Sequence, residues 1–303
     1  MTSSDASAVE RALGVFQSHP GDLLVLVGPT ATGKTALAVA LAQRLGGEVI
    51  SADSVQIYEG FDVGSGKPTA DDLSVVRHHL VSAIHPMQPV DAGWWADAAS
   101  RAVEDVRSRG GVPIVCGGTF LWVKALLFGL AKAPKADPDL RATHRALAER
   151  EGRSALHLRL RVLDPESALR LHPNDFVRVS RALEVCELTG KPMSEWQREH
   201  GFSTPLYRAH LVALATDAIT HEERIRARVT QWLAQGWLEE VSSLLARGYG
   251  TARAMGSVGY AQVRAAVEGT LPREGLDDVI VRATRVFARR QRTWLRHAEV
   301  IWL

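Results

Sequence analysis

The feature of the sequence that most constrains the fold is the stretch LVGPTATGKT, which ends at Thr35. It has the G-x-x-x-x-G-K-T spacing of a phosphate-binding loop, whose backbone N–H groups and following helix N-terminus surround phosphate oxygens. The apolar run Leu23 to Val27 precedes the loop, and residues 35–45 have the apolar spacing of a helix. This order predicts the first unit of a parallel α/β sheet that binds a di- or triphosphate. Lys34 supplies a mobile positive charge, and the Thr35 hydroxyl is the candidate ligand of Mg²⁺.

The rest of the chain continues the alternation of strands and helices. Short apolar runs at residues 48–51, 79–83, 112–116, 209–215 and 300–303 are expected as strands. The expected helices include residues 91–109, 238–246, 259–267 and 276–296, and one that begins at a capping box over Thr220 to Glu223 and runs to Gly236. Strands that alternate with helices predict a parallel sheet flanked by helices on both faces.

One segment breaks this alternation. Between residues 131 and 200 no strand signal occurs, and short charged helices are punctuated by Pro134, Pro138, Pro165 and Pro173. We therefore expect an all-helical insertion at residues 131–200, within a catalytic core made of residues 1–130 and 201–303. The first twenty residues are expected as an appended N-terminal helix, since they have an early acidic residue and lack the apolar centre of a signal peptide.

Composition excludes several classes of protein. The chain has 303 residues, of which 46% are apolar and 23% charged, and no apolar run is long enough for a bilayer span. A cytoplasmic monomer without an obligate protein partner is the expectation. The two cysteines, Cys116 and Cys186, are far apart in apolar settings and are expected as buried thiols, so neither a zinc site nor a disulfide framework is predicted.

Two polar residues follow expected strands at the edge where open α/β sheets bind ligands. Asp53 comes after the strand at 48–51 and is a candidate general base or water-mediated Mg²⁺ ligand; the alternative is a helix N-cap. Thr119 follows two glycines and is a candidate hydrogen-bond partner for a phosphate or a base, with the same alternative. The strand at 112–116 ends in glycines instead of an acid, and no N-K-x-D string is present, which argues against a motor ATPase or a GTPase.

Arginine dominates the basic residues, and several arginines share one face of the last expected helix. A stripe of guanidinium groups suits nucleic-acid phosphates, although a solvated or ion-paired face is the alternative. Arg178 and Arg181 form a smaller case, and Arg224 with Arg228 could reach a diphosphate. The stripe consists of Arg282, Arg285, Arg289, Arg292 and Arg296.

The motifs taken together resemble those of the bacterial tRNA dimethylallyltransferases, also called tRNA isopentenyltransferases. The resemblance runs over nearly the whole chain, through GPTATGKT, ISADSVQIY, GSGKP, HHL, CGGTFLWVKALLFGL, DPDLR, LHPNDFVRVSRALEVCELTGKP, SVGYAQ and RRQRTWLR. It implies a P-loop, kinase-like core with a helical insertion. It also implies transfer of the dimethylallyl group of dimethylallyl diphosphate to N6 of the adenosine beside the anticodon of tRNA, position 37, with Mg²⁺ as cofactor and diphosphate as leaving group.

The resemblance also implies roles for individual residues. Asp53 would accept the N6 proton, Thr119 would bind near the reacting groups, and Arg224 would assist with the diphosphate. The diphosphate would be held by Gly28, Thr30, Ala31, Thr32, Gly33, Lys34 and Thr35, with Mg²⁺ on Thr35. The tRNA would be contacted by Asp53, Ser54, Val55 and Gln56 and by Val177, Arg178, Val179, Ser180 and Arg181. From spacing alone, Arg282, Arg285, Arg289 and Arg292 would add contacts to the tRNA backbone while the insertion grips the anticodon stem.

Some positions depart from the family pattern, and other functions compete. The family commonly has Pro at Phe176, Gln at Val177, Tyr at Trp122 and a G-T-A-K-P-like string where this chain has Gly64-Ser65-Gly66-Lys67-Pro68, and these differences affect substrate-loop detail. The rival functions are an adenylate isopentenyltransferase, a small-molecule P-loop kinase and a non-catalytic RNA-binding module. The insertion and the arginine stripe argue for tRNA over a free nucleotide, and productive ATP turnover would distinguish a kinase.

Overall fold

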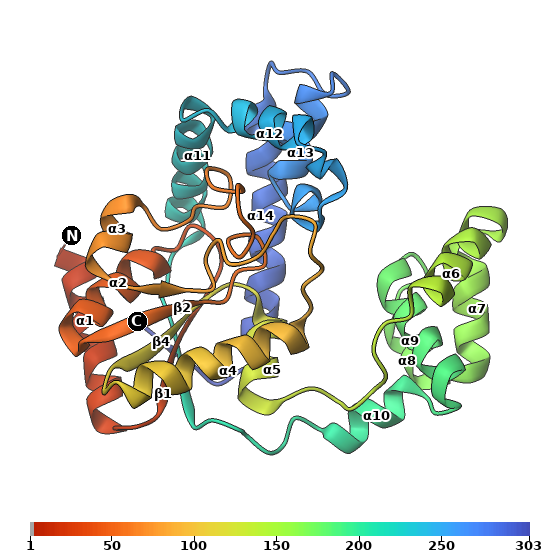
Figure 1. The fold of residues 1–303 in the computed structure, drawn as a ribbon, viewed down its shortest axis with the longest axis horizontal. Coiled ribbons are helices and arrows are strands. Elements are labelled where there is room, and N and C mark those ends of the chain that lie inside the picture. The colour runs from red at the N-terminus through yellow and green to blue at the C-terminus, as the bar shows by residue number, and fades with distance from the viewer. Residues whose placement is uncertain (1–2) are drawn as a thin grey trace. The chain divides into compact units, whose positions relative to one another are not determined.

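The computed structural model describes residues 3–303, with side chains described from residue 6 onward (Figure 1). The chain divides into two compact units. One comprises the chain up to Leu127 together with Leu206–Leu303, and the other comprises Phe128–Pro205.

The first unit is built on a six-stranded sheet in which every neighbouring pair is parallel. The strand order is β3-β2-β4-β1-β5-β6. All five residues of the central strand β1 are buried, because helices cover both faces of a parallel sheet. The predicted α/β fold class is therefore confirmed. The strands are β1 (Leu23–Val27), β2 (Gly47–Ser51), β3 (His78–His79), β4 (Val112–Gly117), β5 (Ala209–Ala213) and β6 (Val300–Trp302).

Helices cover this sheet. Buried side chains of α1 and α2, among them Ala12 and Leu41, pack with Leu26 and Ile114 of the sheet in one hydrophobic cluster. On α4, the buried Trp95 donates from Nε1 to the Ser51 carbonyl at 3.0 Å. The helices of this unit are α1 (Ser3–Ser18), α2 (Lys34–Leu45), α3 (Ala70–Val75), α4 (Ala92–Ser108), α5 (Phe120–Phe128), α11 (Ala218–Ala234), α12 (Trp237–Ala246), α13 (Tyr260–Val267) and α14 (Leu276–Leu295).

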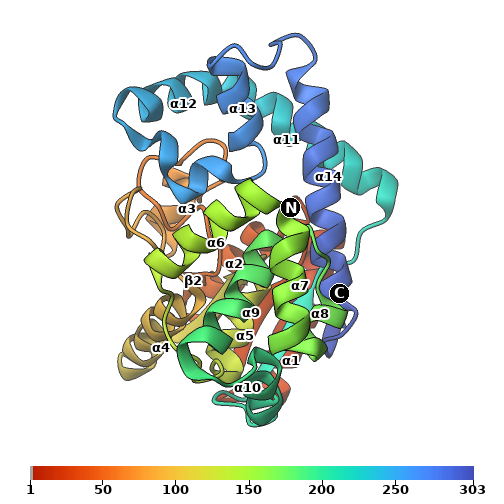
Figure 2. The ribbon, with the colours of Figure 1, turned by 90° about the vertical axis from the view of Figure 1, so that its right-hand side faces the viewer.

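The second unit is all-helical across its described residues. Leu156, Leu160, Val179 and Leu183 centre its own hydrophobic core. Aspartates cap three of its helices, and a proline at the first helical position follows two of those caps. Its helices, several of which lie side by side in Figure 2, are α6 (Pro138–Glu151), α7 (Arg153–Leu163), α8 (Pro165–Arg170), α9 (Phe176–Thr189) and α10 (Met193–His200).

Two local predictions were wrong. The strand expected at 79–83 covers only His78–His79, because Leu80 and Ser82 have φ angles of 61° and 47°, outside the strand region. Helix α11 does not begin at a capping box on Thr220. It begins earlier, where the Asp217 carboxylate accepts from the backbone N–H groups of Ile219 and Thr220.

Other expectations held. The N-terminal helix forms as α1, and both cysteines are buried free thiols. Trp95 and Trp237 are core residues. Among the helices of the described chain, none combines the length and apolar character that crossing a membrane requires.

Candidate active site

The phosphate loop joins β1 to α2. Gly28 and Gly33 have φ angles of 150° and 95°, values that glycine tolerates and that turn the chain back over the start of α2. No side chain caps α2 at Gly33, so the first backbone N–H groups of the helix remain available to an anion. The sequence signature thus produces the backbone geometry of an anion cradle.

Lys34 begins α2 and folds back over the loop. Its Nζ donates to the Pro29 carbonyl at 2.6 Å. Burial lowers the pKa of Lys34 to about 8, and the positive charge of Arg228 adds to this effect. A bound diphosphate would favour the charged ammonium, since opposite charges at close range stabilise one another.

A cavity of about 90 Å³ adjoins this loop. It is lined by side chains and backbone from the carboxyl ends of three adjacent strands, where ligands of open α/β sheets bind. Thr30, Lys34 and Thr35 follow β1, Asp53 follows β2, and Gly118 follows β4. Two wider cavities, of about 400 and 480 Å³, also border the loop. The predicted phosphate loop and the predicted base therefore face one space.

Asp53 is held in a turn after β2. Its Oδ1 accepts from the backbone N–H groups of Val55 at 2.8 Å and Gln56 at 3.2 Å. No regular helix follows, so the N-cap alternative is excluded. Oδ2 accepts no hydrogen bond from any residue that the structure describes, and the half-buried side chain borders the cavity. One carboxylate oxygen thus orients the group, and the other is available for a proton.

Thr119 supports the same turn. Its Oγ1 accepts from the Ser54 backbone N–H at 3.1 Å, so its own hydroxyl hydrogen can still be donated to a ligand. Two residues earlier, Gly117 must be a glycine, because a Cβ there would lie 2.2 Å from the Ala52 carbonyl oxygen. Thr119 and Asp53 are therefore adjacent through Ser54.

Gln56 acts within the loop that surrounds Asp53. Its Oε1 accepts from the Ser51 hydroxyl at 3.0 Å, and its Nε2 donates to the carbonyls of Ser65 at 3.2 Å and Gly66 at 2.9 Å. The amide is thus occupied by the protein's own groups. Its neighbours Ser54 and Val55 are half-buried.

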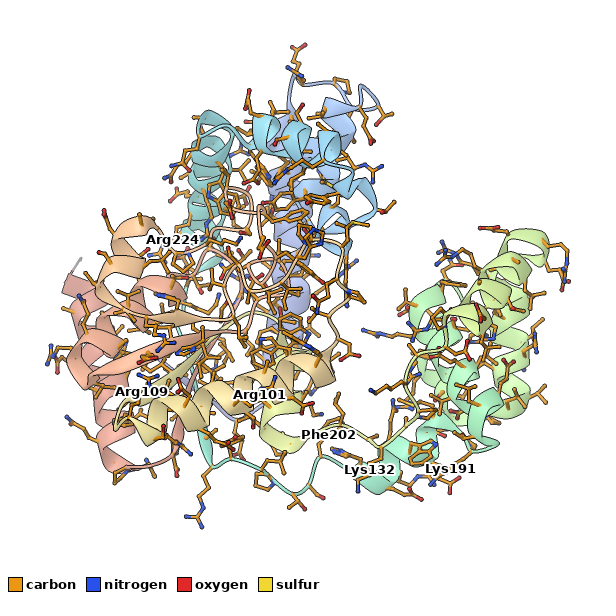
Figure 3. All side chains as sticks on the ribbon, viewed as in Figure 1. Arg101, Arg109, Lys132, Lys191, Phe202 and Arg224 are labelled. Atoms are coloured by element: carbon orange, nitrogen blue, oxygen red, sulfur yellow. The ribbon has the colours of Figure 1, made fainter. Side chains whose placement is uncertain are left out.

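Two arginines of α11 approach the phosphate loop. Arg224, labelled in Figure 3, is exposed, and its Nη1 lies 3.4 Å from the Thr32 carbonyl oxygen. Arg228 is half-buried, donates from Nη1 to Thr30 Oγ1 at 3.3 Å, and lies over the Trp232 ring at 4.7 Å from its centroid. Burial lowers the pKa of Arg228, an effect that the nearby Asp53 partly offsets. Arg228 lines all three cavities around the loop, so it is a stronger diphosphate candidate than its spacing suggested.

Three further residues at the site were missed by sequence reasoning. The buried Gln291 of α14 bonds to both the phosphate loop and Gly118, and His221 of α11 bonds to Thr30. His78 lines the cavity with its Nδ1 against the Val76 carbonyl, while its buried Nε2 has no partner among the described residues. The HHL and RRQR motifs contain His78 and Gln291, and His221 lies in the expected capping box, but nothing in their spacing indicated which atoms they would meet.

The arginine stripe on α14 is narrower than predicted. Arg285 donates to Glu222 at 2.9 Å, and Arg292 donates to His221 Nδ1 at 2.7 Å, so both have partners within the protein. Arg282, Arg289 and Arg296 are exposed, and their side chains form no ion pair or hydrogen bond with any residue from 3 to 303. A phosphate backbone can therefore meet these three directly.

The expected tRNA-contacting stretch of α9 divides between surface and core. Val177 is 76% exposed, and Arg178 is exposed beside Asp175. Val179 is fully buried, and the buried Ser180 bonds to His144 Nδ1 at 3.0 Å, so these two side chains pack inside the helical unit and do not lie on its surface. Arg181 is committed to Glu184 and to the Pro134 carbonyl.

The oxygen atoms that line the cavity fit a Mg²⁺ ion that is bound partly by the protein and partly by the phosphate oxygens of a substrate. The half-buried Thr35 lines the cavity with Asp53 and Ser51, which are all oxygen donors. Among the described residues, no three or more His, Cys, Asp or Glu side chains gather as a metal site. Mg²⁺ usually binds through few protein groups and completes its shell with phosphate oxygens and waters, so a single hydroxyl is compatible with its role.

Comparisons with known proteins agree on one family. A family model described as IPP transferase matches residues 56–298. The chain is similar to the tRNA dimethylallyltransferase of Sorangium cellulosum, with 60% identity over 94% of this chain and 90% of the relative. The relative of the same description from Myxococcus xanthus is 46% identical over 90% of this chain and 89% of its own length.

Solved structures give the same result. The fold is similar to that of the full-length tRNA isopentenylpyrophosphate transferase from Bacillus halodurans, with a TM-score of 0.69, 34% identity, and coverage of 93% of this chain and 89% of that one. It is also similar to a eukaryotic dimethylallyltransferase solved while acting on tRNA, with a TM-score of 0.75, 25% identity, and coverage of 90% of this chain and 69% of that one.

Proposed function

Because the chain belongs to the tRNA dimethylallyltransferase family, we propose that it transfers the dimethylallyl group of dimethylallyl diphosphate to N6 of adenosine 37 of tRNA. In this reaction a bond forms between N6 and C1 of the prenyl group, and the bond between C1 and the diphosphate oxygen breaks. Diphosphate leaves with the electron pair, and N6 loses a proton. The enzyme is a transferase, and its two substrates are an isoprenoid diphosphate and a tRNA.

The observation that carries this proposal is the shared cavity of the phosphate loop and Asp53. The Asp53 Oδ2 atom has no protein partner among the described residues, and Asp53 borders the same cavity as Lys34 and Thr35. A purine amine is a weak nucleophile, so a positioned carboxylate that accepts its proton lowers the barrier. The end of β4 offers Gly117 and Gly118 in place of an acid, which favours a diphosphate leaving group over γ-phosphoryl transfer.

The leaving diphosphate is stabilised by the cationic groups around the loop. The N–H groups from Ala31 to Thr35 surround it, and Lys34, Arg224 and Arg228 balance its charge as the C–O bond breaks. Mg²⁺ on the Thr35 hydroxyl, when bound, would neutralise part of the same charge. The Thr119 hydroxyl, next to Asp53, donates to an atom of either substrate near the reacting centre.

The target base must leave its stack to enter the cavity. We assign the Ser54 to Gln56 turn to the wall against which the base rests. Arg282 and Arg289 contact the phosphate backbone, as does Arg178 at the exposed start of α9, where the exposed Val177 offers an apolar contact to the tRNA. The helical unit at residues 128–205 grips the anticodon stem in this proposal.

Two tRNA transcripts that differ only at position 37 test the proposal. Each is incubated with the protein, Mg²⁺ and dimethylallyl diphosphate, and its nucleosides are then measured by mass spectrometry. Dimethylallyl-adenosine is expected from the transcript with A37 and is expected to be absent from the transcript with G37. Equal modification of both transcripts would refute the target position, and modification of free AMP in preference to tRNA would favour an adenylate prenyltransferase.

A further inference from the structure

Thr30, in the phosphate loop, has each of its polar groups held by a residue from far along the chain. Its backbone N–H donates to Gln291 Oε1 at 2.9 Å, and its carbonyl accepts from His221 Nε2 at 2.8 Å. Its hydroxyl accepts from Arg228 at 3.3 Å. The N–H and carbonyl of one residue belong to two successive peptide planes, so these contacts orient both planes where the loop begins to turn.

Gln291 connects two parts of the site. Its side chain is 6% exposed, and its Nε2 donates to the Gly118 carbonyl at 2.9 Å. A Cβ at Gly118 would lie 2.3 Å from this Nε2 and 3.3 Å from the Gly28 carbonyl oxygen, so three chain segments meet there without spare room. One amide therefore ties the phosphate loop to the segment that presents Thr119.

His221 is held in a single protonation state by its two partners. A carbonyl only accepts and a guanidinium only donates, so Nε2 carries the hydrogen toward Thr30 and Nδ1 accepts from Arg292 at 2.7 Å. Burial lowers the pKa of His221, and the positive charges of Arg292, Lys34 and Arg224 lower it further. The histidine is thus a neutral, fixed donor to the loop.

We propose that Gln291 and His221 are positioning residues, which set the Thr30 peptide groups so that the phosphate loop is ready for the diphosphate. Gln291 also fixes the distance from that loop to Gly118 and Thr119. Gln291 of α14 contacts the segments that follow β1 and β4, and His221 of α11 contacts the segment that follows β1. The inference rests on the proposed prenyl transfer, since it assigns these residues to that site.

The test compares steady-state kinetics of four variants of the full chain. Gln291→Met keeps the length of the side chain and removes both hydrogen bonds, and His221→Leu removes the donor to Thr30. His221→Gln retains an amide donor for the Thr30 carbonyl. Gln262→Met is the matched control, because Gln262 Oε1 also accepts from a backbone N–H, that of Gly259 at 2.7 Å, but borders none of the three cavities.

The expected result is a specific change in the handling of dimethylallyl diphosphate. Gln291→Met and His221→Leu should each lower kcat/KM for this substrate by about tenfold or more, through a higher KM and a lower kcat. The KM for tRNA should stay within about twofold of that of the wild type, since P-loop geometry does not enter tRNA affinity. His221→Gln should recover most of the loss, and Gln262→Met should have wild-type kinetics even where it lowers the melting temperature.

Three outcomes would overturn the inference. Wild-type kinetics of folded Gln291→Met would remove its positioning role, and an equal loss in Gln262→Met would mean that only stability had changed. If Gln291→Met does not fold, equal activities of His221→Leu and His221→Gln would refute the positioning role, because restoring a donor to Thr30 would then have no effect. Calorimetric titration with inorganic diphosphate and Mg²⁺ separates the two proposals. If the wild type does not prenylate tRNA, the proposed function fails, while weaker diphosphate binding by His221→Leu than by the wild type would still support positioning.

Discussion

Replacement of Asp53 by asparagine separates the two oxygens of this side chain. The Asn carbonyl oxygen can still accept from the backbone N–H groups of Val55 and Gln56, so the turn after β2 should be preserved. The change removes the charge and basicity at the Oδ2 position, which has no partner among the described residues. General-base catalysis contributes about 10² to 10⁴ in rate, so kcat should fall by that factor, equivalent to about 3 to 5 kcal/mol of barrier.

Asp53→Ala provides the contrast in stability. It removes both backbone hydrogen bonds, each of which contributes about 1 kcal/mol, and should lower the melting temperature by roughly 4 to 8 °C. Asp53→Asn should stay within about 2 °C of the wild type. Both variants should have a similarly low kcat and should bind tRNA normally.

The assay measures kcat at saturating dimethylallyl diphosphate and tRNA, together with thermal unfolding by circular dichroism. Saturation separates the chemical step from binding. A kcat for Asp53→Asn within about twofold of the wild type would refute the role of Asp53 as base. A large loss confined to Asp53→Ala would reassign the residue to holding the turn.

Three further predictions address the loop charge, the surface arginines and the helical unit. Burial lowers the pKa of Lys34 to about 8, so the affinity for dimethylallyl diphosphate should fall as pH rises through that value. Lys34→Met should bind this substrate weakly at every pH. A wild-type affinity that stays constant between pH 7 and 10 in calorimetry would contradict the prediction. Unfolding at the same pH values should show stability rising from about pH 8 toward the unfolded pKa of 10.5, because the unfolded chain then binds more protons. Joint change of Arg282 and Arg289 to alanine should reduce the slope of log affinity for tRNA against log salt concentration by about 1.4 to 1.8, measured by filter binding. Arg285→Ala, which breaks an internal pair with Glu222, should reduce this slope less. An unchanged slope would mean that the arginine stripe is a solvated face and not a tRNA contact. Glu184→Gln should destabilise the helical unit by about 3 kcal/mol in urea titration, because it breaks the charged hydrogen bonds that Arg141 and Arg181 donate to this fully buried carboxylate. Burial raises the pKa of Glu184, but these hydrogen bonds outweigh burial and lower it, so the stabilisation should be lost as pH falls through the lowered pKa. Identical urea midpoints for the variant and the wild type would refute this prediction.

Local patterns predicted the parts of the site that are continuous in the chain. The phosphate loop could be predicted from residues 28–35, because the glycine spacing determines its conformation and Lys34 and Thr35 supply its charge and hydroxyl. Asp53 was suspect because it follows a buried strand, and its position at the carboxyl edge of the sheet depends only on the parallel topology. The helix boundary at Thr220 was missed because Asp217, three residues earlier, satisfies the same capping chemistry.

Contacts between distant segments could not be predicted in this way. Gln291 and Thr30 are 261 positions apart, and nothing in either local pattern indicates that their atoms meet. The helical spacing of the arginines correctly assigned them to one helix, but it could not distinguish Arg292, which faces His221, from Arg289, which faces solvent. Likewise Val179 and Ser180 adjoin exposed Arg178, and only the packing of α9 on α6 and α7 places them inside.

The central claim is that the phosphate loop serves an isoprenoid diphosphate and not the γ-phosphoryl group of a nucleotide. The most direct test incubates unmodified tRNA with the protein and Mg²⁺ in two tubes, one with dimethylallyl diphosphate and one with ATP, and analyses nucleosides and nucleotides by mass spectrometry. The account predicts dimethylallyl-adenosine in the first tube and neither that nucleoside nor ADP in the second. An unmodified tRNA in the first tube with ADP formed in the second would contradict it and would make the protein a kinase.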